Sequence, residues 1–155
     1  MLAAFQRLSS TFIPGREKRW PALILAFFGV VYFTISASNH YFFRSFCFDY
    51  GTYNQMFYQY AHLKMNSTVY EPQLDNFLET HLTLTLMVLS PLYWVLKWFM
   101  GTYALFLIQT GFILSGGYAV WLLVKKRSGN DLLAALFMLH YFVIQGHFSA
   151  LAADY

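Results

Sequence analysis

Four long apolar stretches organise the chain, and they cover residues 20–38, 82–100, 102–124 and 132–153. A helix needs about 20 mainly apolar residues to cross the hydrocarbon core of a membrane, and each stretch approaches that length. Soluble proteins bury such helices only inside large domains, and a chain of 155 residues is too short to surround four of them with polar structure. The pattern therefore predicts an all-α, polytopic integral membrane protein.

Charge is scarce and unevenly placed. Only 11% of the residues are charged, against about 25% in an average soluble chain. Most basic residues lie just before the first apolar stretch or just after the third, where cytoplasmic charge is expected, and no basic stripe with interleaved aromatic rings is present. We therefore expect a membrane partner and no nucleic acid. The two basic clusters are Arg7, Arg16, Lys18 and Arg19, and then Lys125, Lys126 and Arg127.

Both basic clusters can be cytoplasmic only if one apolar stretch does not cross the membrane. Residues 82–100 are the natural choice, because Pro91 interrupts the middle of this stretch and Lys97 lies near its far end. We predict a cytoplasmic segment 1–19, an outward span 20–38, an exterior loop 39–101 with amphipathic and juxtamembrane or re-entrant helices, an inward span 102–124, a cytoplasmic turn 125–131 and an outward span 132–153. A full crossing by 82–100 remains the alternative.

The first stretch has features of a signal peptide, with basic residues before it and small residues at its end. Its apolar run is long for a signal peptide, so we interpret it as an uncleaved membrane anchor. The single cysteine, Cys47, excludes a disulfide within the chain.

Asp49 is the first candidate for chemistry, because it stands among aromatic residues in the predicted exterior loop. Residues 49–64 are predicted to form an interfacial amphipathic helix with Asp49 as its N-cap. Capping and catalysis are compatible roles for this carboxylate. The predicted apolar face carries Tyr50, Tyr53, Phe57, Tyr60 and Ala61, and the polar face carries Thr52, Gln55, Gln59 and His62.

Further titratable residues are expected on the same exterior face. Glu79 and His81 either cap the helix that begins near residue 82 or bind a divalent metal or a phosphate-bearing ligand, although no second histidine four residues away supports a metal site. Asp154 follows the last apolar stretch and would emerge on the side of Asp49. The sequence contains no nucleophile elbow, phosphate-binding loop or dinucleotide fingerprint.

Two local patterns concern packing. Gly116 and Gly117, with Gly111 and Ser115, suit close approach to a neighbouring membrane helix. The segment 128–131 is predicted to form a tight turn that caps the following helix.

Three motifs resemble those of a prokaryotic family of uncharacterised polytopic membrane proteins, known as domain of unknown function 2079. They are FDYGTYNQ (48–55), NFLETH (76–81) and PLY (91–93), and the likeness spans residues 20–155. Departures from the family pattern are Glu79 and Thr80 in place of Gly-Asp, Leu84 in place of a proline, and residues 153–155, which match a later motif only at its centre. Family members are longer, so we expect an N-terminal portion.

The family is itself similar to the GT-C class of lipid-linked-sugar glycosyltransferases. That similarity implies transfer of a sugar from a polyprenyl-phosphate donor at the exterior face of the bacterial inner membrane, with Asp49 as general base and Asp154 as a second catalytic acid. A cation or a divalent metal would stabilise the departing phosphate. The candidate substrate-binding residues are Arg44, Tyr50, Tyr53, Gln55, Lys64, His81 and Lys97, with Glu79 and His81 as weaker candidates for metal ligands.

The expected partners are membrane lipid, the polyprenyl-phosphate sugar, and further transmembrane helices of a longer chain or a partner subunit. The alternative function is a non-catalytic membrane subunit or transporter-like module, in which the acidic residues cap helices.

Overall fold

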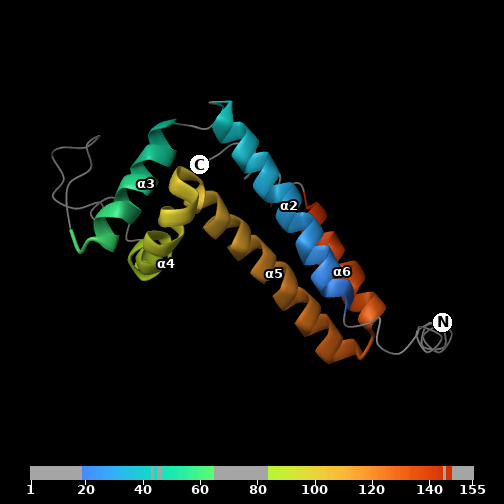
Figure 1. The fold of residues 1–155 in the computed structure, drawn as a ribbon. Helices are drawn as coiled ribbons and strands as arrows, with labels where there is room; N and C mark the ends of the chain where they lie inside the picture. Colours follow the sequence, from blue (N-terminus) through green and yellow to red (C-terminus); the bar gives the residue numbers. More distant parts are fainter. Residues whose placement is uncertain (1–18, 43, 45–46, 65–83, 145, 148–155) are drawn as a thin grey trace. The chain divides into compact units, whose positions relative to one another are not determined.

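The computed structural model describes residues 19–42, 44, 47–64, 84–144 and 146–147. In chain order, these residues form α2 (Trp20–Tyr41), α3 (Cys47–Ala61), α4 (Leu84–Met100), the short 3-10 helix η3 (Gly101–Tyr103), α5 (Ala104–Ser128) and α6 (Asp131–Val143), as Figure 1 shows. The described ranges contain no strand. The predicted all-α class is confirmed, and a helix occupies each of the four apolar stretches.

Two helices have the length that a membrane crossing needs. α2 has 22 residues and α5 has 25. At 1.5 Å per residue these helices are about 33 and 37 Å long, against a hydrocarbon core of about 30 Å. By length and hydropathy, α2 and the continuous stretch from Leu84 to Ser128 qualify as membrane spans. α6 ends at Val143, because Ile144 adopts an extended backbone, so the helix stops before the end of the predicted third span.

A glycine separates α4 from α5. Gly101, the first residue of η3, has a φ of +56°, in the left-handed region that residues with a side chain rarely adopt. This break divides the apolar stretch Leu84–Ser128 into two helices. α4 alone has 17 residues, or about 25 Å, which is less than the thickness of the core. That α4 does not cross the membrane stays a prediction.

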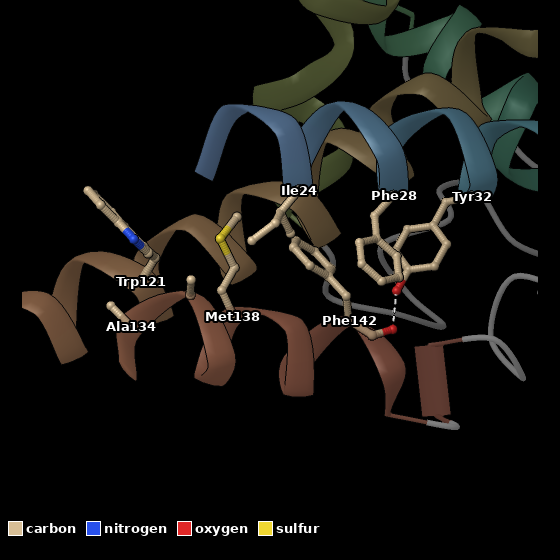
Figure 2. Close-up of a cluster of buried hydrophobic side chains, with 8 residues drawn as sticks. Ile24, Phe28, Tyr32, Trp121, Ala134, Met138 and Phe142 are labelled. Carbon is tan, nitrogen blue, oxygen red and sulfur yellow. Dashed lines mark hydrogen bonds between the residues drawn. The ribbon is translucent and has the colours of Figure 1, made fainter. Parts of the chain in front are cut away.

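The chain divides into two compact units. Among the described residues, the first unit comprises Arg19, residues 20–35 of α2, 109–128 of α5 and all of α6. In its core, Phe28 and Phe142 stack with ring centroids 4.8 Å apart, and the Tyr32 hydroxyl donates a hydrogen bond to the carbonyl of Phe142 (Figure 2). The buried core residues of this unit are Ile24, Phe28, Tyr32, Trp121, Ala134, Ala135, Met138 and Phe142.

Glycines let α5 approach α6 closely. A Cβ atom on Gly117 would lie 2.1 Å from Cζ of Phe142, and one on Gly116 would lie 2.3 Å from the hydroxyl oxygen of Tyr141. No atom lies within 4 Å of the corresponding position on Gly111. Close packing is therefore confirmed for Gly116 and Gly117, whereas for Gly111 it stays a prediction, since no described residue packs on it.

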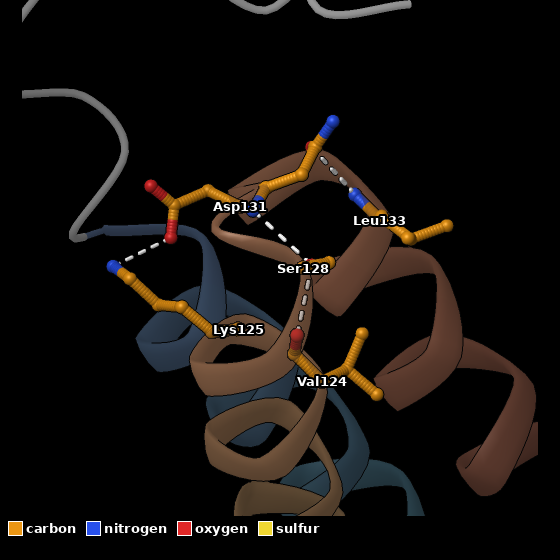
Figure 3. A network of polar contacts seen from close by, with 6 residues as sticks. Val124, Lys125, Ser128, Asp131 and Leu133 are labelled. Carbon is orange, nitrogen blue, oxygen red and sulfur yellow. Dashed lines mark hydrogen bonds and ion pairs between the residues drawn. The ribbon is translucent and has the colours of Figure 1, made fainter. Parts of the chain in front are cut away.

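The turn between α5 and α6 is held by polar contacts. Lys125 and Asp131 form an ion pair of 2.5 Å, and Asn130 caps α6 by accepting a hydrogen bond of 3.0 Å from the backbone N–H of Leu133 (Figure 3). The Ser128 hydroxyl accepts from the backbone N–H of Asn130 and donates to the carbonyl of Val124. The predicted capping turn is confirmed.

The second unit contains the described residues of 36–108. Here α3 packs on α4: the rings of Phe57 and Tyr93 stack 5.1 Å apart, and the Tyr93 hydroxyl donates to Oδ1 of Asn54. α4 continues through Pro91, which cannot donate to the carbonyl of Met87. The Ser90 hydroxyl donates to that carbonyl at 2.8 Å and replaces the missing donor.

Candidate functional site around the first turn of α3

Asp49 lies in the first turn of α3. The helix begins at Cys47, so Asp49 is its third residue. The prediction that Asp49 is the N-cap is wrong, because the helix begins two residues before it. Acidic residues are favoured in the first helical turn by the positive end of the helix dipole, so the position still suits a carboxylate.

Tyr50 ties this first turn to the segment after α4. Its side chain is buried, and its hydroxyl donates a hydrogen bond to the carbonyl of Thr102 in η3. Its ring stacks on Phe106 in α5, with centroids 5.1 Å apart and an interplanar angle of 14°. The backbone next to Asp49 is thereby fixed at the start of α5.

His40, in the last turn of α2, completes the same cluster. Its Nε2 lies 3.2 Å from the Thr102 hydroxyl oxygen, and its ring centroid lies 4.8 Å from that of Tyr50, 5.1 Å from that of Tyr103 and 5.3 Å from that of Phe106. We call these five residues the His40 cluster. It joins the end of α2, the first turn of α3, η3 and the start of α5 within the second unit.

His40, Thr102, Tyr103 and Phe106 were not among the site residues predicted from the sequence. The available signal was a histidine two residues beyond an apolar stretch, where polar side chains usually find a partner. Local periodicity could not predict that His40 contacts Thr102, which is far away in the sequence, or that it contacts the three aromatic rings.

Side chains on both the predicted apolar face and the predicted polar face of α3 are buried. Tyr50, Phe57 and Tyr60 are buried as predicted, but Thr52 and Gln59 are each only 9% exposed, so the predicted polar face is wrong for these two residues. Burial raises the pKa of Tyr60 above its ordinary value. The predicted amphipathic helix is thus buried over most of its circumference. Tyr53 and Gln55 are half-buried.

The candidate cations differ in their surroundings. Arg44 is exposed, and its backbone N–H donates to the carbonyl of Asn39 at 2.9 Å, which holds Arg44 close to the end of α2. Lys64 is also exposed and follows α3. The Lys97 ammonium lies 4.0 Å from the ring centroid of Tyr58, within the range of a cation–π contact. Arg44 is the nearest of the three to Asp49 along the chain.

Three predicted site residues, Glu79, His81 and Asp154, lie outside the described residues. Among the described residues, no group of three His, Cys, Asp or Glu side chains is arranged to hold a metal ion. The metal site therefore stays a prediction from sequence.

The family comparison covers all of the site. The family model described as "Predicted membrane protein (DUF2079)" matches residues 39–155, from the last turn of α2 to the end of the chain. The match includes the whole His40 cluster and begins after the segment 20–38. Searches of curated proteins and of solved structures give no match. With three quarters of its length in this match, the chain belongs to the DUF2079 family of predicted membrane proteins.

Proposed function

We propose that this membrane protein is part of a GT-C-like glycosyltransferase that takes a sugar from a polyprenyl-phosphate donor at the exterior face of a bacterial inner membrane. The observation that carries the proposal is the His40 cluster, which fixes the turn containing Asp49 against the ends of two apolar helices. A polyprenyl-phosphate donor has its isoprenoid chain in the membrane and its phosphate at the surface. In this proposal, an acidic residue in the turn at these helix ends acts on the reacting part of such a donor.

The proposed chemistry is an inverting transfer. The acceptor hydroxyl attacks the anomeric carbon of the sugar, Asp49 takes the hydroxyl proton, and the bond from the anomeric carbon to the phosphate oxygen breaks. The electron pair of that bond leaves with polyprenyl phosphate. Arg44 is the candidate that stabilises the departing phosphate, because it is exposed and lies in the short connection that leads to Asp49. Lys64 and Lys97 are further candidates, together with Tyr53, Gln55 and His81 for binding the sugar.

A non-catalytic membrane subunit is the second candidate. It is favoured by the burial of Tyr50 and Phe106, whose rings pack on each other and on His40. In that case the cluster serves assembly with further transmembrane helices, and Asp49 contributes only to the helix terminus.

Replacement of Asp49 tests the proposal. The purified protein, reconstituted in liposomes with a radiolabelled polyprenyl-phosphate hexose, is expected to release the hexose by transfer to water or to a supplied alcohol. Asp49→Asn should lower this rate by at least about 100-fold, the usual contribution of a general base.

Asp131→Asn is the matched control, since it removes a carboxylate that is paired with Lys125 in the α5–α6 turn. It should retain the rate, and both variants should keep the helical content of the parent protein. Equal rates for Asp49→Asn and the parent protein would reject the base role and favour the subunit.

A further inference from the structure

The last two turns of α5 have an inner and an outer side. On the inner side, Trp121 is buried, the Lys125 ammonium lies 4.7 Å from its ring centroid, and the same ammonium pairs with Asp131. Figure 3 shows Lys125 and Asp131 meeting across the turn. The charge of Lys125 is therefore neutralised within the protein.

The outer side carries two further cations. Lys126 and Arg127 are exposed, and each lies four residues after an exposed leucine, Leu122 or Leu123. Residues four apart are neighbours on one face of a helix. Each exposed cation therefore stands one helical turn beyond an exposed apolar side chain.

The start of α2 lies at the same end of the first unit as the α5–α6 turn. Figures 1 and 3 both show this start beside the α5–α6 turn. Arg19 is exposed there, and Trp20 and Leu23 are exposed on the first turns of the helix. Among the described residues of this unit, four Lys and Arg side chains stand against one carboxylate, that of Asp131, which is already paired. The excess positive charge therefore lies on the exposed side chains.

We propose that this end of the first unit binds the headgroup of an acidic phospholipid. Lys126 and Arg127 contact the phosphate, and the acyl chains lie along Leu122 and Leu123. A cation one turn beyond an exposed leucine matches an amphiphile, because the charged headgroup can lie at the cation while the attached hydrocarbon chain lies at the leucine. A soluble phosphate compound would leave the leucines unused. The general bias of basic residues toward the cytoplasm applies to every Lys and Arg alike. The proposed lipid site does not include Lys125, because Lys125 is already paired with Asp131.

Lipid-dependent thermal unfolding of the purified full chain in a neutral detergent tests the site. The probes are dioctanoyl phosphatidylglycerol and, at the same concentrations, dioctanoyl phosphatidylcholine and glycerol 3-phosphate. A ligand that binds only the folded state stabilises it by RT ln(1 + [L]/Kd), so the unfolding temperature rises with the ligand concentration and reports the Kd. We expect a rise with phosphatidylglycerol that follows this logarithmic dependence on concentration, and no rise with the other two probes.

The variant K126Q/R127Q should bind phosphatidylglycerol at least fivefold more weakly. The exchanged variant K126R/R127K, which conserves both charges, should bind it within twofold of the parent chain. Equal shifts with phosphatidylcholine, an equal shift with glycerol 3-phosphate, or an unchanged titration of K126Q/R127Q would each overturn the proposal. These readouts do not depend on glycosyl transfer, so loss of the proposed activity leaves this inference intact.

Discussion

The contacts that join the helices within the first unit differ from those within the second. In the first, the α5–α6 contact depends on residues without a side chain, because Gly116 and Gly117 lie directly against the rings of Tyr141 and Phe142. In the second, hydroxyl groups on aromatic rings join the elements, from Tyr50 to η3 and from Tyr93 to α3. The first unit also has such a hydroxyl, since Tyr32 of α2 donates to the carbonyl of Phe142 in α6. What distinguishes the units is therefore the α5–α6 contact, which should be sensitive to added volume, whereas the second unit should be sensitive mainly to the loss of a hydrogen-bond donor.

Gly117→Ala should have the largest effect on stability. The new Cβ would lie 2.1 Å from Cζ of Phe142, a fully buried ring that would have to shift. Overpacking of this kind costs about 1–3 kcal/mol, and we expect the upper end of that range. The free energy of unfolding can be measured by denaturant titration in detergent micelles, followed by circular dichroism.

Gly111→Ala is the matched control on the same helix, since no atom lies within 4 Å of its Cβ position. It should leave stability unchanged or raise it by up to about 1 kcal/mol, because alanine favours the helix. Phe142→Leu should restore part of the stability of Gly117→Ala. If both glycine variants are equally stable, α5 and α6 do not depend on this close contact.

The helices of both units were predictable because their signals are local. Apolar length located α2, α4 and α5, and the small residues Gly116 and Gly117 marked a close helix contact. The turn residues at 128–131 identified the cap of α6, which Asn130 provides. Each of these inferences needs only neighbouring residues, and each agrees with the structure to within a few residues.

Tyr93→Phe should have an intermediate effect and should act on the second unit. Tyr93 is 1% exposed, and its hydroxyl donates to Oδ1 of Asn54. The variant keeps the stacking of the ring on Phe57 but leaves the Asn54 oxygen without this donor. We expect a loss of about 1 kcal/mol in the free energy of unfolding.

Tyr58→Phe tests whether the loss of any tyrosine hydroxyl on α3 or α4 lowers the free energy of unfolding. Tyr58 is exposed, and its ring, rather than its hydroxyl, lies beneath Lys97. The expected change is within about 0.5 kcal/mol, as for most exposed substitutions. A loss equal to that of Tyr93→Phe would show that the second unit does not depend on the Tyr93–Asn54 hydrogen bond.

The candidate site was less predictable than the helices. Asp49 and the aromatic residues around it could be identified from sequence, but the start of α3 at Cys47 and the burial of Thr52 and Gln59 could not. His40 and Thr102 are 62 residues apart, and their contact depends on how α2, η3 and α5 come together. Side chains that join distant segments leave no periodic signal, so the His40 cluster required the structure.

Ser90→Ala should have the smallest effect, and its size should depend on the neighbouring proline. The Ser90 hydroxyl donates to the carbonyl of Met87, which Pro91 leaves without its usual backbone donor. Loss of this bond should cost about 0.5 kcal/mol, less than Tyr93→Phe, because a serine bonded back to its own helix offsets part of its gain.

A double-mutant cycle with Pro91→Ala separates this role from ordinary packing. Pro91→Ala restores a backbone N–H that can donate to Met87, so Ser90→Ala should then have almost no effect on the free energy of unfolding. A non-zero coupling free energy between the two substitutions supports the role of the Ser90 hydroxyl as the replacement donor to the Met87 carbonyl. If Ser90→Ala costs the same in both backgrounds, the hydroxyl contributes by packing, and α4 tolerates its proline for another reason.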